Sequence, residues 1–373
     1  MPELEVSIIV PALNEADNLR ALAERIDAAL AGRAYELIIV DDNSRDATSQ
    51  ICEELSERFP IRLIVRPLPK DGLSGAVLEG LAVATGEFIV VMDADLQHPP
   101  EKIPELLSLL ESDDADFVIG SRYVEGGSIE RGWTPYRALN SKLATLLARP
   151  FAGRVRDPMS GFFAMRRRDY ASATRLTPLG YKIALELLCK SRVRRVREVP
   201  IHFGKRLAGE SKLNVKEQFR YLEHLSRLYD FSFPRLVPVL KFLIVTTISW
   251  CVAFAYFITV RPSGWPALAS VTVSYVWVIA VTAVFHARYV RTQREFLVRP
   301  RPWIDFFLAA AGEWVVCGVT AAYLLHRAGV EREFEVLMLS FAAAMMTRYV
   351  LRKELLLDVR GLRHELRKDE MLP

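Results

Sequence analysis

The segment EFIVVMDADLQHPPE, residues 87–101, decides the fold. Its apolar run from Phe88 to Met92 has the length and branched side chains of a buried strand. Asp93 and Asp95 follow at once, and carboxylates two residues apart on an extended chain point to the same side. Because two nearby carboxylates repel each other, a bound divalent cation would stabilise the pair. The segment therefore predicts a strand of an α/β domain that ends in a metal site.

Short apolar runs of the same kind alternate with amphipathic stretches up to about residue 235. Strand–helix alternation predicts an α/β domain with a largely parallel sheet, which binds ligands at the carboxyl ends of its strands. The predicted strands are residues 6–10, 36–42, 61–65, 87–95 and 116–123, and the predicted helices are residues 15–30, 44–59 and 101–112.

The second part of the chain has the composition of a membrane domain. Residues 242–260 and 263–285 carry no charged side chain, and each is about long enough to cross a bilayer, which takes roughly 20 helical residues. A third apolar stretch, residues 304–326, is interrupted by Asp305 and Glu313. We expect four transmembrane helices, at about 239–260, 266–287, 304–326 and 334–351.

Arginine placement predicts a multi-pass membrane protein whose catalytic domain and both termini are cytoplasmic, because positive charges stay on that side. No basic segment precedes an apolar run at the N-terminus, as a signal peptide would require. The basic residues of the predicted cytoplasmic loop and tail are Arg288, Arg291, Arg294, Arg299, Arg301, Arg352, Lys353, Arg360, Arg363, Arg367 and Lys368, against Arg261, Arg327 and Arg332 on the other side.

Composition excludes several classes of protein. The 373 residues include 49 basic and 45 acidic ones, a balance that argues against a nucleic-acid binder. The four cysteines form no CxxC pair, which predicts free thiols in a reducing compartment. Neither a GxxxxGK[ST] phosphate loop nor a GxGxxG dinucleotide fingerprint is present.

Three regions follow from these patterns: a catalytic domain at 1–213, an interfacial segment at 214–235 and a membrane domain at 236–373. Within the interfacial segment, Phe219, Leu222, Leu225 and Tyr229 recur at helical spacing. Two interpretations remain open for this helix. It lies on the membrane surface, or it packs against the catalytic domain.

Polar residues also follow the first two predicted strands. Pro11 to Glu15 end the first strand, and Val40 and Asp42 end the second, where an acidic side chain can accept hydrogen bonds from a ribose or a base. Asn43 and Ser44 are suitable caps for the next helix. His98 is either a ligand or base of the site, or it terminates the loop with the two prolines after it.

Taken together, these strand ends resemble the nucleotide-sugar half of the GT-A fold in glycosyltransferase family 2. From residue 5 to about 225 the chain resembles the dolichyl- and polyprenyl-phosphate mannose synthases of that family. The membrane half resembles the four-helix GtrA-like module through Arg288-Tyr289 and Arg348-Tyr349. The motifs that carry the first resemblance are GLSGA (72–76), DADLQHPPE (93–101), GSRY (120–123), DPMSGF (157–162), GYKI (180–183), EVPI (198–201) and GESKL (209–213).

The resemblance implies a role for each matching residue. Pro11, Leu13, Glu15, Val40 and Asp42 match positions that hold the guanosine, although the family commonly has an aromatic residue in place of Leu13. Asp93, Asp95 and Gln97 match the metal ligands, and Ala94 lies with them against the diphosphate. Arg122, Arg206 and Lys212 match positions that hold phosphate groups. Arg122, Arg137 and Ser141 match positions that hold the acceptor phosphate. The expected catalytic residues are Asp95, Arg122 and Arg206.

The implied activity is inverting transfer of mannose from GDP-mannose to a polyprenyl monophosphate, with Mg²⁺ or Mn²⁺ as the cofactor. The implied partners are the nucleotide sugar, the lipid acceptor and the membrane. Two alternatives stay open: a transferase that uses a UDP-sugar on the same lipid, and a catalytically inactive lipid-binding or scaffold protein.

Glu313 lies inside the third predicted span. An ionised carboxylate there is costly unless it is paired. We expect it to face the bundle and meet Arg288 or Arg348, which close neighbouring helices; the alternative is a shallower helix with Glu313 at the membrane interface.

Overall fold

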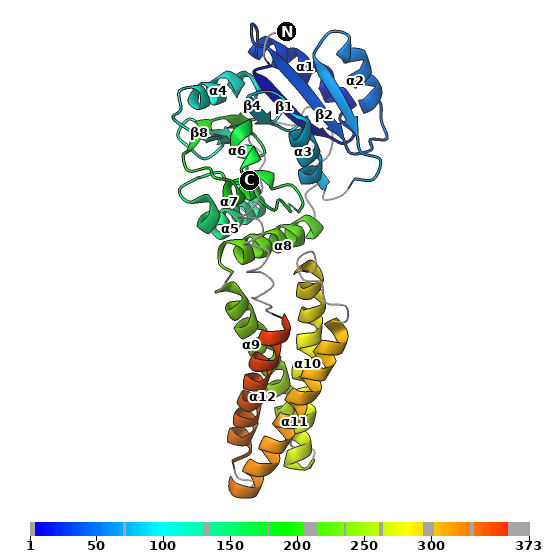
Figure 1. The fold of residues 1–373 in the computed structure, drawn as a ribbon, viewed down its shortest axis with the longest axis vertical. Helices are drawn as coiled ribbons and strands as arrows, with labels where there is room; N and C mark the ends of the chain where they lie inside the picture. The colour runs from blue at the N-terminus through cyan, green and yellow to red at the C-terminus, as the bar shows by residue number, and fades with distance from the viewer. Residues whose placement is uncertain are drawn as a thin grey trace. The chain divides into compact units, whose positions relative to one another are not determined.

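The structure is a computed structural model that describes residues 4–69, 72–129, 135–177, 179–204, 215–234, 236–260, 264–293, 302–328 and 332–356. The chain divides into two compact units, Met1–Pro234 and Arg235–Pro373. The first unit is a mixed α/β fold and the second is helical (Figure 1). Both classes of structure were predicted, and each unit is described by itself.

A sheet of seven strands forms the centre of the first unit, in the order β3-β2-β1-β4-β7-β5-β8. Neighbouring strands are parallel except around β7, which runs antiparallel to β4 and β5. All five predicted strands are present, so the largely parallel sheet is confirmed. The strands are β1 Val6–Ala12, β2 Tyr35–Asp41, β3 Ile61–Val65, β4 Phe88–Val91, β5 Phe117–Ser121, β7 Phe163–Arg166 and β8 Val196–Pro200, with a separate pair of β6 Ser128–Ile129 and β9 His202–Phe203.

The reversed strand β7 has a direct effect on the site. Phe163, at its start, pairs with Val91 at the end of β4 and with Ile119 near the end of β5. The loop that leads into β7 therefore reaches the sheet at the same edge where β4 and β5 end. Residues 157–162 are brought beside Asp93 in this way, although more than sixty positions separate them in the sequence.

Helices cover both faces of the sheet. Successive side chains of β1 point to opposite faces and all are buried, so both faces need a cover. Ile8 packs with α1, α2 and α4, whereas Ile9 packs with α3 and α7 on the other face. The helices of this unit are α1 Ala16–Ala29, α2 Thr48–Ser56, α3 Gly72–Val83, α4 Ile103–Glu111, α5 Pro135–Ala152, α6 Arg167–Ala171, α7 Ile183–Lys190 and α8 Val215–Ser232, with a 3₁₀ turn, η1, at Pro100–Lys102.

One local prediction is wrong. Asn43 and Ser44 do not cap the helix that follows them, because α2 begins only at Thr48. Asp46 accepts the Thr48 backbone N–H at 3.0 Å instead. Ser44 Oγ accepts the backbone N–H of Asn14 at 2.8 Å, so it joins the loops that follow β1 and β2.

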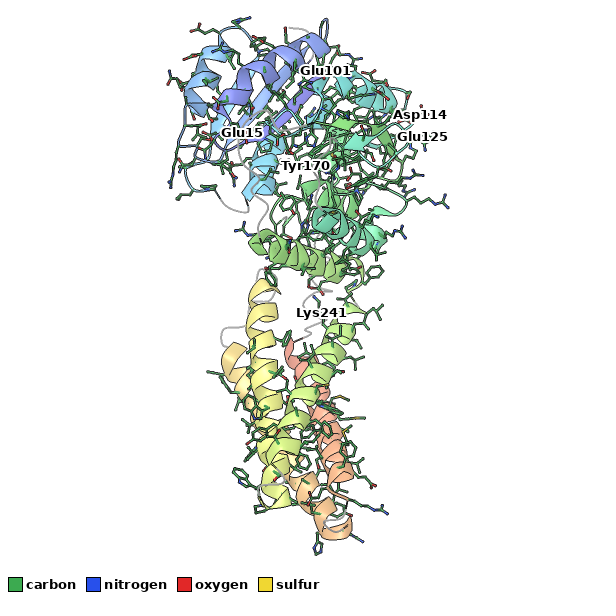
Figure 2. The ribbon with its side chains drawn as sticks, turned by 180° about the vertical axis from the view of Figure 1, so that it is seen from behind. Glu15, Glu101, Asp114, Glu125, Tyr170 and Lys241 are labelled. Atoms are coloured by element: carbon green, nitrogen blue, oxygen red, sulfur yellow. The ribbon has the colours of Figure 1, made fainter. Side chains whose placement is uncertain are left out.

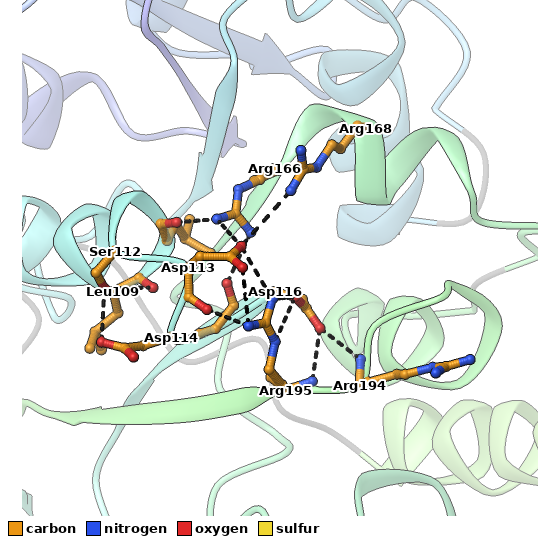
Figure 3. Close-up of polar contacts among 11 residues, drawn as sticks. Leu109, Ser112, Asp113, Asp114, Asp116, Arg166, Arg168, Arg194 and Arg195 are labelled. Carbon is orange, nitrogen blue, oxygen red and sulfur yellow. Dashed lines mark hydrogen bonds and ion pairs between the residues drawn. The ribbon is translucent and has the colours of Figure 1, made fainter.

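A cluster of arginines and aspartates joins the end of α4 to β7 and β8 (Figure 3). The buried Arg166 donates to the Ala115 carbonyl at 3.1 Å and to Asp113 Oδ1 at 2.8 Å. Arg195 forms an ion pair with Asp116 at 2.7 Å. Arg166 also donates to the Leu110 carbonyl in the last turn of α4, one of the carbonyls that the end of a helix leaves without an intrahelical partner.

The helix α8 packs against α5 and α7 of the same unit, which confirms the packing interpretation for part of its surface. Leu225 is 3% exposed and contacts α5 and α7, whereas Phe219 and Leu222 are 58% and 51% exposed. His224 Nε2 lies 2.6 Å from Glu186 Oε2 on α7, and Glu186 also binds Lys190. Burial alone would raise the pKa of Glu186, but His224 and Lys190 lower it to about 2. The hydrogen bond between His224 and Glu186 therefore attaches α8 to α7.

The described part of the second unit consists of four helices: α9 Val237–Val260, α10 Ala267–Gln293, α11 Pro302–Ala328 and α12 Glu333–Leu356. Of the described residues, three segments are long and apolar enough to cross a membrane: Val239–Thr259, Ala267–Phe285 and Phe306–Arg327. They lie in α9, α10 and α11, and the predicted fourth span lies in α12. These helices are those of a membrane protein.

Glu313 is fully buried in this unit and meets Arg348, one of its two predicted partners. Arg348 Nε donates to Glu313 Oε2 at 2.9 Å, and Arg348 Nη2 lies 2.8 Å from the same oxygen. The Tyr275 hydroxyl donates to Glu313 Oε2 at 3.3 Å. The side chain of the other predicted partner, Arg288, lies outside the described residues. A carboxylate on α11 thus joins a guanidinium on α12 and a phenol on α10.

Candidate active site

The two carboxylates lie directly after β4, at the middle of the sheet. Asp95 is 4% exposed, and its Oδ1 accepts the backbone N–H of Gln97 at 3.1 Å. Leu96, between them, has a φ of 60°, a left-handed conformation that costs a branched residue about 1–3 kcal/mol. This turn folds the chain back after Asp95, so that Asp93, Asp95 and Gln97 share one short loop.

His98 terminates this loop, and one of its two ring nitrogens is bound to the backbone. Its Nδ1 accepts the backbone N–H of Asp93 at 3.2 Å, which occupies the lone pair of that nitrogen. The ring stacks on Phe162 and contacts Phe203, each at 5.5 Å between centroids. Burial lowers the pKa of His98 to about 4, which keeps the ring neutral at pH 7. Of the two interpretations of His98, the structure supports the one in which it ends the loop.

The residues present fit a magnesium or manganese ion. The described residues contain no group of three or more His, Cys, Asp or Glu side chains placed to hold a metal. Two carboxylates and one amide would leave several coordination positions to substrate, which suits ions that bind through substrate phosphates. Gln97 Nε2 donates to the Gly204 carbonyl at 3.0 Å, so the bond occupies its nitrogen and not its oxygen, the atom that a cation requires. A Cβ on Gly161 would lie 3.3 Å from Asp93 Oδ1, a tight contact that would make the carboxylate shift by a few tenths of an ångström.

Arg122, which follows β5, forms a bidentate ion pair with Asp157. Its Nε and Nη2 each lie 2.7 Å from a carboxylate oxygen of Asp157, and its backbone N–H donates to the same group at 3.1 Å. Asp157 is fully buried. Burial would lower the pKa of Arg122, but the Asp157 carboxylate raises it, so the guanidinium stays charged. Asp157 therefore fixes the orientation of Arg122, a contact that sequence reasoning missed because 35 residues separate the two.

Lys182 lies in the same place, immediately before α7. Its Nζ donates to the Met159 carbonyl at 2.8 Å and lies 4.3 Å from the centre of the Tyr181 ring. Burial and the charge of Arg122 lower the pKa of Lys182 to about 7, against the opposing effects of Asp157 and Asp93. Lys182 belongs to the GYKI motif at 180–183, but no role was predicted for this lysine from the sequence.

The predicted nucleotide residues meet at the ends of β1 and β2. Pro11 pairs with Val40 in the parallel register, and the Asp42 N–H donates to the Ala12 carbonyl at 2.9 Å. Leu13 and Glu15 follow β1 at the same edge; Glu15 is labelled in Figure 2.

Asp42 already has a cationic partner, Arg66, which also binds Glu79 at 2.8 Å. Burial raises the pKa of Asp42, and Arg66 opposes that shift. Arg66 is thus a third residue whose role the sequence did not reveal; it directly follows β3, which no motif covers.

Four predicted site residues cannot be placed. Arg206 and Lys212 lie outside the described residues. Arg137 and Ser141 belong to α5, but their side chains also lie outside that part of the chain.

Residues 7–174 match the family model for glycosyl transferase family 2. The dolichol-phosphate mannosyltransferase of Pyrococcus furiosus is 45% identical over 245 residues, 65% of this chain and 68% of that protein. The enzyme of the same name from Mycosarcoma maydis is 44% identical over 249 residues, 64% of this chain and 83% of its own. That of Saccharomyces cerevisiae is 41% identical over 241 residues, 62% of this chain and 89% of its own. Among solved structures, mannosyl-3-phosphoglycerate synthase from Rubrobacter xylanophilus has a TM-score of 0.49 at 20% identity, over 61% of this chain and 75% of that chain.

The mixed sheet, with paired carboxylates after its central strand, defines the class of protein: a glycosyltransferase of the GT-A fold. The chain belongs to glycosyl transferase family 2, and its similar relatives there are dolichol-phosphate mannosyltransferases.

Proposed function

We propose that this glycosyltransferase moves mannose from GDP-mannose to a polyprenyl monophosphate of the dolichyl type, with inversion at the anomeric carbon. The observation that carries the proposal is the identity of 41–45% to three dolichol-phosphate mannosyltransferases. The three-residue set Asp93, Asp95 and Gln97 and the ion pair of Arg122 with Asp157 support a reaction between two phosphorylated substrates.

The chemistry needs no strong general base. A monophosphate has a second pKa of about 6 and is mostly ionised at neutral pH, by analogy with phosphorylated side chains. Its oxygen forms a bond to C1 of the mannose while the bond from C1 to the donor diphosphate breaks. GDP leaves with that electron pair, and no proton has to be removed from the acceptor. A neutral His98 and the lack of an assigned catalytic base are compatible with this reaction.

The protein's own residues orient the reactants. Asp93, Asp95 and Gln97 would hold a divalent cation, which when bound supplies positive charge to the leaving diphosphate. Asp157 holds Arg122 with its guanidinium plane fixed, and arginine is suited to planar contacts with phosphate. Positioning of this kind supplies a large part of the rate enhancement when two anions must approach each other.

We further propose that the protein crosses the membrane several times with its catalytic unit and both termini in the cytoplasm. The excess of arginine and lysine in the last turns of α10 and α12 and in the segments after them supports this orientation. A lipid acceptor in the same membrane would then be held near the catalytic unit.

The deciding experiment is a competition. The purified full-length chain is given GDP-mannose and UDP-glucose at equal concentration, with a polyprenyl phosphate and Mg²⁺ or Mn²⁺. We expect mannosyl lipid as the main product, with an inverted anomeric configuration by NMR. Preferential transfer of glucose would replace the donor assignment with the UDP-sugar alternative, and absence of transfer from any donor would favour the scaffold alternative.

A further inference from the structure

The loop from Asp157 to Gly161 connects three charged groups of the active site. Asp157 binds Arg122, the Met159 carbonyl accepts from Lys182, and Gly161 lies against Asp93. Every second residue of this short loop thus contacts one charged group: the guanidinium of Arg122, the ammonium of Lys182 or the carboxylate of Asp93. β7 delivers this loop to the edge where β4 ends, and Arg122, Lys182 and Asp93 there lie close enough to interact electrostatically.

The two cations of this cluster differ in how they are neutralised. Arg122 has a buried carboxylate bound to two of its nitrogens. For Lys182, within the described ranges, the contacts of Nζ are the Met159 carbonyl and the Tyr181 ring, neither of which carries a full negative charge. Lys190, eight residues further on, shows the usual solution for a buried lysine, because Glu186 lies 2.6 Å from its Nζ.

An ammonium group has three N–H donors, and the Met159 carbonyl takes one of them. Lys182 is half-buried, and a charge that is partly withdrawn from water is costly unless an opposite charge accompanies it. Two carboxylates, Asp157 and Asp93, interact electrostatically with Lys182. Asp157 already binds Arg122, and the predicted cation would neutralise Asp93. An anionic ligand therefore suits this position.

We propose that Lys182 is a further substrate-binding residue of the reaction centre, whose ammonium group donates to a phosphoryl oxygen. The proposal rests on the proposed function for the identity of the phosphates. The oxygen belongs either to the donor diphosphate or to the acceptor monophosphate, which present the same chemistry to an ammonium group.

The test uses the full-length chain and separates the two sources. Lys182→Met removes the charge and every donor, whereas Lys182→Gln removes the charge and keeps a donor for the Met159 carbonyl. Lys182→Arg restores the charge. Lys102→Met is the control, because Lys102 pairs with Glu105 on the surface. Binding of GDP, of UDP and of a short polyprenyl phosphate is measured separately by calorimetry with Mg²⁺ present, and thermal unfolding reports the fold.

We expect Lys182→Met and Lys182→Gln to weaken binding of a nucleoside diphosphate or of the polyprenyl phosphate by about tenfold or more, as loss of a charged hydrogen bond implies. Lys182→Arg should recover most of that affinity, and Lys102→Met should change neither. The ligand whose affinity falls identifies the phosphate.

Affinities within twofold of the wild type for all three ligands, in a Gln variant that unfolds like the wild type, would overturn the proposal. So would a loss in Lys102→Met equal to that in Lys182→Gln. If the wild type binds UDP rather than GDP, the proposed donor fails, but the role of Lys182 is still measured with UDP. The two failures are therefore distinguishable.

Discussion

Single residues of the active site differ in how far their roles could be read in advance. The shared loop of Asp93, Asp95 and Gln97 was predictable because they follow one apolar strand within five residues, and their role as metal ligands stays a prediction. The roles of Asp157, Lys182 and Arg66 could not be predicted, because each depends on a partner that the fold brings from a distant segment. Arg122 was identified, yet its bidentate bond to Asp157 was not, since pairing across 35 residues leaves no periodic pattern.

Replacing Asp95 by Asn tests the metal site. The amide keeps the shape of the carboxylate but removes a charge from the proposed ligand set, so we expect transfer to fall by roughly a hundredfold or more. Thermal stability should change little, because Asp93 and Asp95 repel each other when no cation is bound. Asp114→Asn removes the same charge at an exposed position away from the site and is the control. Near-normal turnover of Asp95→Asn at saturating Mn²⁺ would contradict the assignment.

Replacing Asp157 by Asn tests its effect on Arg122. The change leaves a buried guanidinium without its counter-charge, which costs about 3–5 kcal/mol where one partner of a buried pair is removed. We expect a lower unfolding temperature and a loss of transfer, measured on the same preparation. Asp113→Asn, which breaks an ion pair at a more exposed carboxylate, should lower stability less and leave transfer intact. Equal effects of the two changes would argue against a positioning role for Asp157.

At the scale of helices and strands, the strands that appear as apolar runs in the sequence were predicted correctly, whereas the order in which strands pair was not. Strands β1 to β5 are apolar runs with polar ends, and their existence followed from that pattern. The antiparallel β7 and the edge strand β8 were not predicted, because their order depends on which strand pairs with which. In α8, helical spacing placed Phe219 and Leu225 on one face, but packing against α5 and α7 buries only Leu225.

The packing of α10, α11 and α12 depends on the buried Glu313–Arg348 pair. Glu313→Gln should lower the unfolding temperature of the detergent-solubilised chain, because it leaves Arg348 charged among apolar helices. The double variant Glu313→Gln, Arg348→Met should be more stable than Glu313→Gln alone, which a double-mutant cycle would measure. Additive losses from the two changes would indicate that the ion pair does not couple these helices.

For the whole molecule, the division into a catalytic and a membrane part followed from composition. All the described strand-end residues of the site belong to the first unit, Met1–Pro234. A chain that ends at Pro234 should therefore still bind GDP-mannose, which calorimetry would measure. Transfer to a long polyprenyl phosphate should fall, because the truncated enzyme loses the local concentration that a shared membrane gives, and a short soluble acceptor should partly restore it. A folded truncation that no longer binds the donor would show that the second unit completes the site.

The antiparallel strand β7 also affects how the catalytic unit can open. It is hydrogen-bonded on both sides, with Ala164 opposite Val90 on one neighbour and opposite Val118 on the other. Amide protons in such a position exchange with solvent only when the sheet itself comes apart, whereas the loops before β7 and after β4 exchange through small local movements. The reactive loops are therefore attached to the part of the unit that unfolds last. Movements of these loops therefore leave the distance between their points of attachment on β4 and β7 unchanged.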